Sequence, residues 1–169
     1  ALDCARAIEA FSRDFRERPL QKQLGFGITR IGFETGPAIV GDVGGSRKLD
    51  YTAHGNAMNA AARLEAANKQ LGTAIAIGPG AAMRLAPDQL RPLGLIEIRG
   101  RSEKQNVFTT WPNGFDHTTR DLLYRIPGMT PERAIHNLEA HLDRHPHDEP
   151  ARRQIERLRS LLGAAATET

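Results

Sequence analysis

The feature that most constrains the fold is a glycine-rich hairpin pattern that leads directly into a helix pattern. Apolar residues over 37–43 and again over 49–53 predict two short strands, and residues 44–48 between them predict a turn. Residues 56–70 then place alanine and leucine at helical spacing, and Gly72 stands where that helix should end. A chain with this order is predicted to mix strands and helices.

Apolar patterns on both sides extend this mixture. Residues 2–16 predict an amphipathic helix that ends before Pro19. We also expect a buried strand within 25–36 that includes Phe26 and Ile28, a strand over 74–78, a short helix over 79–85, and a second hairpin built from 93–98 and 106–111. This order predicts an α+β fold in which helices flank a sheet.

The composition changes after Pro112, and this divides the chain into a first portion, 1–112, and a tail. Residues 113–129 contain turn formers without a regular period, which predicts a linker. Residues 130–163 predict a helical hairpin, with Thr130 as the first N-cap and Asp148 as the second. Residues 164–169 are expected to be disordered.

Composition excludes several classes of function. The net charge over 169 residues is +3, and this excess of basic over acidic residues is too small to indicate a nucleic-acid partner. No apolar run approaches the roughly 20 residues that span a bilayer, so no membrane segment is expected in this chain. The single cysteine, Cys4, excludes an internal disulfide, suits a reducing, cytoplasmic location, and is expected to be a small buried side chain. The chain begins at Ala1 without a signal-like segment and looks like the interior of a longer protein.

One pair of polar residues on the predicted helix 56–70 could carry chemistry. Asn59 and Arg63 are four residues apart, so they project from the same face, away from the predicted apolar stripe. An amide and a guanidinium in this position could orient a sugar and stabilise a phosphoryl group, because the arginine fork matches phosphate oxygens. An exposed helix face with a solvated arginine explains the same spacing.

The sequence around this pair resembles that of a known family. Residues 27–45 (GITRIGFETGPAIVGDVGG), 51–73 (YTAHGNAMNAAARLEAANKQLGT) and 92–111 (PLGLIEIRGRSEKQNVFTTW) are closely similar to the class III nucleotidyl cyclases, the adenylate and guanylate cyclase family. The resemblance covers roughly the first two-thirds of the chain. It implies the C-terminal portion of a ferredoxin-like catalytic domain, and an adenylate cyclase that forms cyclic AMP and pyrophosphate from ATP, or accepts GTP, in signal transduction.

The resemblance also implies roles for individual residues. Asn59 and Arg63 match the asparagine and arginine that stabilise the transition state, in which a ribose 3′-oxygen attacks the α-phosphate. Thr52 matches the residue that contacts the purine, and Arg99 matches a cation that contacts the terminal phosphates. Without the resemblance, Thr52 would be an ordinary strand threonine and Arg99 a hairpin-end cation. His54 is interpreted as a packing or hydrogen-bonding residue.

The family's metal site has no counterpart in this sequence. The family binds two ions, Mg²⁺ or Mn²⁺, through two aspartates upstream of this region, and none of Asp3, Asp14, Asp42 and Asp50 matches them. We therefore expect the chain to be a fragment that is inactive alone. The family pattern implies a head-to-tail homodimer, and a parent that is cytoplasmic or anchored with its cyclase domain on the cytoplasmic side. The alternative is an inactive regulatory or scaffold module.

The tail predicts a different kind of partner. Residues 130–163 resemble a tetratricopeptide helix pair, and a protein partner would fit such a unit. Only one unit is visible, whereas repeat arrays need several. His141, His145 and His147 with Asp148 suggest a metal site only weakly, because Pro146 turns the chain between them. We interpret them as a solvated turn between two helices.

Overall fold

The computed structural model describes residues 1–45, 48–98 and 103–167. The helices are α1 (Leu2–Arg16), α2 (Pro19–Gln23), α3 (Asn56–Leu71), α4 (Pro79–Ala82), α5 (His117–Arg125), α6 (Pro131–Arg144) and α7 (Glu149–Thr167), with 3₁₀ turns η1 (Pro87–Gln89) and η2 (Ile126–Gly128). The strands are β1 (Ile31–Phe33), β2 (Ile39–Gly45), β3 (Lys48–His54), β4 (Ile75–Ile77), β5 (Leu90–Ile96) and β6 (Gln105–Thr110). Within the described part of the chain, no helix combines the length and apolar content needed to cross a bilayer.

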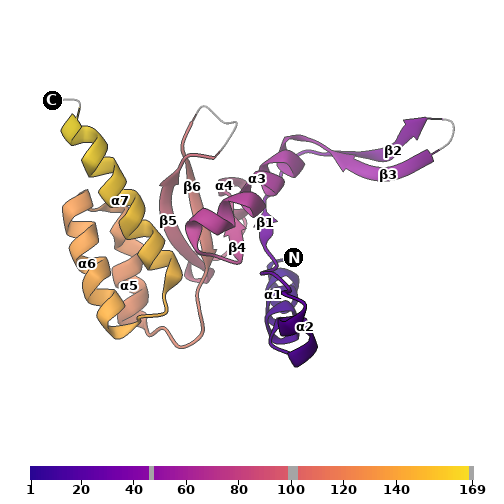
Figure 1. Ribbon diagram of the computed structural model, residues 1–169. Coiled ribbons are helices and arrows are strands. Elements are labelled where there is room, and N and C mark those ends of the chain that lie inside the picture. The colour runs from indigo at the N-terminus through magenta and orange to yellow at the C-terminus, as the bar shows by residue number, and fades with distance from the viewer. Residues whose placement is uncertain (46–47, 99–102, 168–169) are drawn as a thin grey trace.

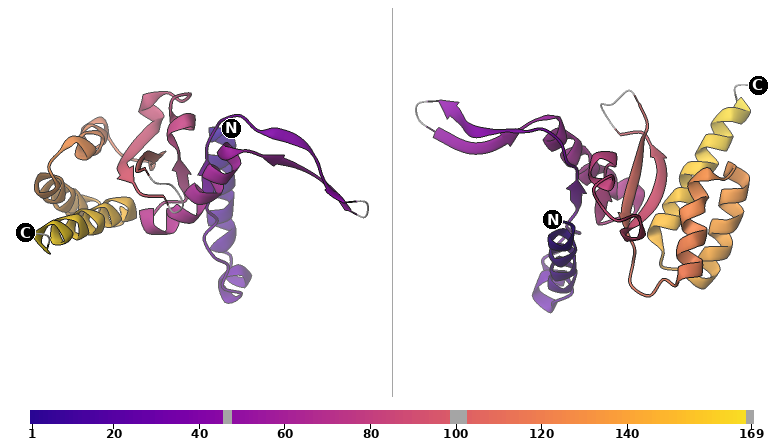
Figure 2. Two further views of the ribbon diagram at one scale, coloured as in Figure 1. Left: turned by 90° about the horizontal axis from the view of Figure 1, so that it is seen from above. Right: turned by 180° about the vertical axis from the view of Figure 1, so that it is seen from behind.

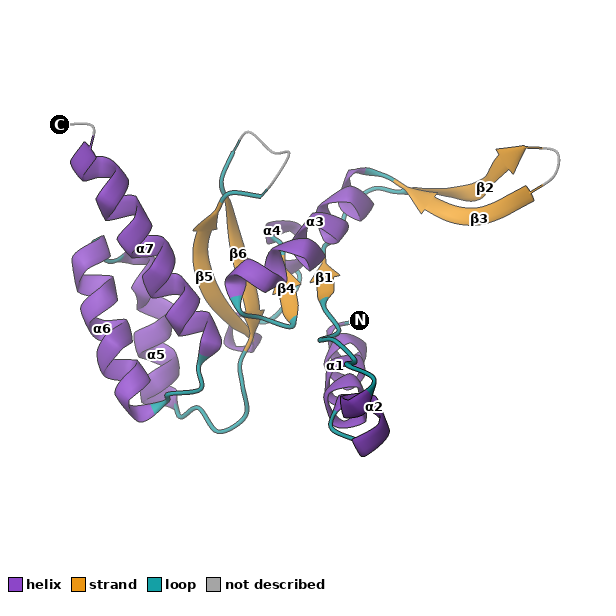
Figure 3. Cartoon of the chain, viewed as in Figure 1, coloured by secondary structure: helices purple, strands orange, loops and turns teal. Residues whose placement is uncertain are grey.

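A four-stranded sheet forms the centre of the molecule, and helices flank it (Figure 3). The strand order is β1-β4-β6-β5. β1 and β4 are parallel, and β6 is antiparallel to both of its neighbours. This arrangement confirms the predicted α+β fold and the second hairpin, which is β5–β6.

The first hairpin, β2–β3, forms a separate two-stranded ribbon. Its register pairs Ile39 with His54 and Gly41 with Thr52. The ribbon projects away from the sheet at the N-terminal end of α3, in all three views (Figures 1 and 2). The strand–turn–strand prediction is therefore confirmed for the described residues, and the tip at 46–47 lies outside them.

Helix α3 packs closely on β1, and a glycine makes this possible. A Cβ atom at Gly32 would lie 1.8 Å from the carbonyl oxygen of Ala61, so only glycine fits there. Next to this contact, the buried Asn68 donates from Nδ2 to the carbonyl oxygen of Ile31 at 3.0 Å. Gly72 ends the helix in the left-handed conformation, with φ of 69°, as predicted. The helix is thereby held at a fixed place on the sheet.

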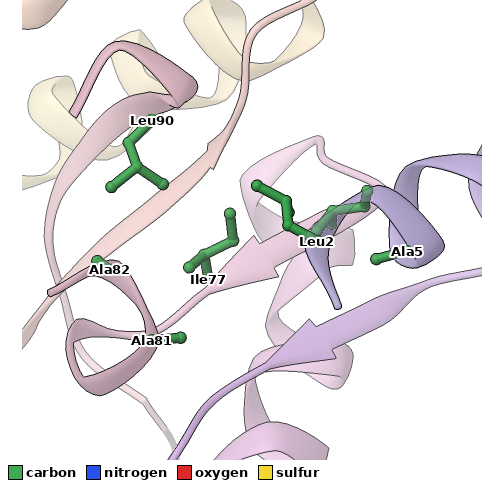
Figure 4. Close-up of a cluster of buried hydrophobic side chains, with 7 residues drawn as sticks. Leu2, Ala5, Ile77, Ala81, Ala82 and Leu90 are labelled. Atoms are coloured by element: carbon green, nitrogen blue, oxygen red, sulfur yellow. The ribbon is translucent and has the colours of Figure 1, made fainter. Parts of the chain in front are cut away.

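One core cluster joins α1 to the opposite side of the sheet. Figure 4 shows Leu2 and Ala5 of α1 facing Ile77 of β4, with α4 and β5 contributing beyond it. The buried members are Leu2, Ala5, Ile75, Ile77, Ala81, Ala82 and Leu90. Burial of these side chains stabilises the placement of α1 by about 25 cal/mol for each Å² of apolar surface removed from water.

Two predictions for the N-terminal part are wrong. Phe26 and Ile28 are 53% and 52% exposed and precede the strand, because the segment before Arg30 has no strand neighbour among the described residues. Phe26 instead contacts Phe15 edge-on, with ring centroids 5.5 Å apart. Cys4 is exposed rather than buried, since the buried side chains of α1 are Leu2 and Ala5.

Two predictions for the tail are also wrong. The expected linker, 113–129, contains α5, whose N-cap Asp116 accepts from the backbone N–H of Thr119 at 2.7 Å. The tail expected to be disordered continues α7 to Thr167, and residues 168–169 lie outside the described residues. Helix α5 forms because α5, α6 and α7 share a core of their own, built around Leu123, Leu138 and Ile155.

Candidate functional site

The candidate site lies where the projecting hairpin meets α3. Thr52 is half-buried in β3, directly opposite Gly41 in β2. Gly55 connects β3 to α3, and a Cβ atom there would lie 2.6 Å from the carbonyl oxygen of Pro37. A larger residue would therefore push the hairpin away from the helix. The glycine fixes Thr52 just before the first turn of α3.

Asn59 and Arg63 follow on α3, one helical turn apart. Asn59 is exposed and Arg63 is half-buried, whereas the core side of the helix consists of Ala60, Leu64, Asn68 and Leu71. The buried stripe therefore adjoins the pair, while Ala57 and Ala61 of the predicted stripe are only half-buried. Both residues lie on α3 outside its set of buried residues, with Arg63 closer to the core than Asn59.

The N-terminal end of α3 adds a favourable electrostatic environment for an anion. The first turn contains no acidic residue, and no side chain caps its N–H groups. The free N–H groups and the helix dipole make this end positive. Together with the Arg63 guanidinium, these groups would favour a phosphate over a cation.

The other predicted site residues are placed differently. His54 is exposed at the end of β3, opposite Ile39, so it is not a buried packing residue. Arg99 lies outside the described residues. No three His, Cys, Asp or Glu residues gather into a metal-binding group within 1–45, 48–98 and 103–167. Asp3, one of the aspartates that match no metal ligand of the family, is an exposed residue paired with Arg6 at 3.5 Å.

A buried charged cluster joins the sheet to the C-terminal helices, and the sequence did not indicate it. Arg91 of β5 donates from Nη1 to Asp148 at 2.8 Å, and Nε2 of His141 lies 2.6 Å from the other carboxylate oxygen. Desolvation acts to raise the pKa of Asp148, but hydrogen bonds from His141 and Arg91 outweigh it and hold that pKa below its ordinary value. The interpretation of His141 and Asp148 as a solvated turn is therefore wrong, because the cluster excludes water.

Comparisons with known proteins give consistent matches. Two structures of a bacterial light-regulated adenylyl cyclase match the chain with TM-scores of 0.54 and 0.51, at 29% and 28% identity. The matches cover 72% and 70% of this chain but 36% and 35% of those chains. No protein-family model matches the chain.

A curated relative gives the same result by sequence. Adenylate cyclase 1 of Rhizobium meliloti (strain 1021) is 37% identical over 110 residues, which are 64% of this chain and 16% of that protein. The chain thus spans about a sixth of its relative's length. The resemblance found in the sequence is confirmed as a similarity: the chain is similar in sequence to an adenylate cyclase and in structure to bacterial adenylyl cyclases. The tetratricopeptide resemblance of α6 and α7 stays a prediction.

Proposed function

We propose that this chain supplies part of the catalytic site of an adenylate cyclase, which forms cyclic AMP and pyrophosphate from ATP. The observation that carries the proposal is the arrangement of Thr52, Asn59 and Arg63 on two elements that one glycine joins. Relatives that are named adenylate or adenylyl cyclases support it. The same residues could serve GTP, because a threonine hydroxyl both donates and accepts.

The proposed roles follow from the chemistry of each side chain. Arg63 would donate to the phosphoryl oxygens as negative charge develops, since its guanidinium stays protonated and matches their geometry. The Asn59 amide would hold the ribose so that its 3′-oxygen points at the α-phosphate. Thr52 would contact the base, and Arg99 would contact the terminal phosphates. The metal ions would have to be held by residues outside the described ones.

The hairpin supports the proposal that two copies associate head to tail. Ile39, Val40 and Tyr51 on the ribbon are 81%, 56% and 75% exposed, and Met58 at the start of α3 is 48% exposed. Large apolar side chains grouped on a projecting ribbon are typical of a surface that a partner covers. In the extended protein, a second copy would bring its upstream metal aspartates to Asn59 and Arg63. An adenylate cyclase built in this way would act in the cytoplasm, where ATP is present.

The proposal is tested by a comparison of two proteins in one assay. The chain extended by its upstream residues should convert ATP to cyclic AMP with Mg²⁺ or Mn²⁺. The 169-residue chain alone should form no product above background, because none of its aspartates matches the two metal-binding aspartates of the family. Product formation by the chain alone contradicts the assignment of the metal site. Inactivity of the extended protein, with proven binding of ATP, supports instead the regulatory module.

Replacement of Thr52 by alanine should affect ATP binding more than the chemical step. The hydroxyl would contact the base, which does not change charge in the reaction, so we expect KM for ATP to rise about tenfold while kcat falls little. The preference for ATP over GTP should also relax. Steady-state kinetics with both nucleotides measure this, and Thr118→Ala, an exposed threonine of α5, is the control. An unchanged preference would show that Thr52 does not contact the base.

A further inference from the structure

A groove of about 770 Å³ lies between β5, η2 and α7, next to the C-terminal end of α3 and so at the opposite end of that helix from the candidate site. Figure 1 shows α7 near β5, and a hydrogen bond from Arg157 to Leu93 joins the two elements. Most of the wall is apolar, and its main side chains are Leu93, Leu95, Ile126, Pro127, Leu158 and Leu161. Leu95 and Leu161 are 65% and 52% exposed, so the apolar wall continues to the opening. Volume and lining match those of sites for small organic ligands.

Arg157 is a cation in this apolar groove, and its charge is incompletely satisfied. Its Nη2 donates to the carbonyl oxygen of Leu93 at 3.3 Å, while Nη1 is shielded from solvent and has no hydrogen-bond partner among the described residues. Desolvation lowers the pKa of Arg157 to about 10, and the nearby Glu156 only partly opposes this. Glu156 is already paired with Arg153 at 2.9 Å.

The other charged residues of the groove do not neutralise Arg157. Glu97 and Lys104 lie on the rim, are both exposed and carry opposite charges. Solvent screens exposed charges, so they contribute little inside the groove. A half-buried guanidinium without a carboxylate is partly desolvated at a cost, and an anion that brings its own apolar surface would reduce that cost.

We infer that the groove binds an amphiphilic carboxylate, with the carboxylate on Arg157 and the apolar body along the leucine wall. A carboxylate suits the site because a guanidinium can donate to both of its oxygens, and one cation balances one negative charge. The apolar body would cover Leu95 and Leu161, which water now contacts. This site is separate from Thr52, Asn59 and Arg63, so the inference does not depend on the proposed cyclase activity.

Calorimetric titration of the protein with decanoate, below its micellar concentration, tests the inference. We expect saturable binding with one site. Arg157→Gln should weaken it about tenfold or more, because glutamine can still donate to Leu93 but has no charge. Decanol should bind equally to the protein and to Arg157→Gln, since it lacks the carboxylate. Arg159→Gln, which removes the same charge from the exposed side of α7, should bind decanoate like the unchanged protein.

A second variant keeps the test decisive if Arg157→Gln fails to fold. Leu161→Glu introduces a carboxylate at the exposed opening of the groove, where the fold does not depend on the side chain. It should compete with decanoate for Arg157 and weaken binding to a similar extent. Absence of saturable decanoate binding overturns the inference, and so does equal decanoate affinity of the unchanged protein and the folded variants.

Discussion

Replacement of Arg63 by alanine in the extended, active protein should lower kcat for cyclic AMP formation about a hundredfold or more, with little change in KM. The guanidinium would act on charge that develops only in the transition state, and loss of one such donor costs on the order of 3 kcal/mol. Lys69→Ala removes an exposed cation from the same helix and should leave kcat unchanged. Asn59→Ala should resemble Arg63→Ala, because misplacement of the ribose also slows the chemical step.

A mixing experiment separates this role from a structural one. If two subunits share each site, the Arg63→Ala protein and a protein without its metal aspartates are both inactive, yet their mixture regains part of the activity. One of the two sites in the mixed dimer then contains every required residue. Failure of the mixture, with mixed dimers demonstrated, would refute the shared site. An unchanged kcat in Arg63→Ala would refute the role of Arg63 itself.

Replacement of Asp148 by alanine should destabilise the protein by about 3–5 kcal/mol, the usual cost of leaving one buried partner of an ion pair behind. Arg91, at 1% exposure, would lose its only carboxylate among the described residues, and the buried His141 would lose its acceptor. Denaturant unfolding followed by circular dichroism measures the change. Asp143→Ala, which removes an exposed carboxylate from α6, should change stability by less than about 0.5 kcal/mol.

The same cluster predicts how stability depends on pH. Because the pKa of Asp148 is lower in the folded than in the unfolded protein, its contribution is present above the ordinary carboxyl pKa. It is lost as pH falls below about 4, when the folded carboxylate takes up a proton. Asp148→Ala should therefore flatten the acid limb of the stability curve. A difference between the two proteins that stayed constant from neutral pH to the acid limb would contradict the ionised cluster.

Local patterns in the sequence were enough to place α3 and the two hairpins. Alanine and leucine at helical spacing, with Gly72 as a stop signal, located the helix to within one residue of its observed end at Leu71. Helix α5 was missed because its two buried residues, Thr119 and Leu123, are too few to give a period. Asp116 could have indicated the start of α5, because aspartate is common at the N-cap position. Its carboxylate there accepts a hydrogen bond from the backbone N–H three residues later.

The site was predictable in part for the same reason. Asn59 and Arg63 are neighbours through helix geometry alone, whereas their proposed roles rest on the family resemblance. Arg91 and Asp148 are separated by 57 residues, and only the tertiary fold brings them together. Arg157 looks like an ordinary surface arginine in a charged helix, and its burial depends on the position of β5. Such contacts are set by packing between elements, which local patterns do not encode.

The Arg91–Asp148 pair also affects where this chain can be truncated and which of its parts recombination can exchange. A cut after Pro112, where composition alone would place a domain boundary, would leave a buried guanidinium in β5 without its counterion. It would also remove Arg157 from Leu93 and separate β5 from α5 and η2, which contact it. We therefore expect the first portion, 1–112, and the three C-terminal helices to unfold together. Recombination that exchanged one part without the other would have to replace both halves of this charge pair together.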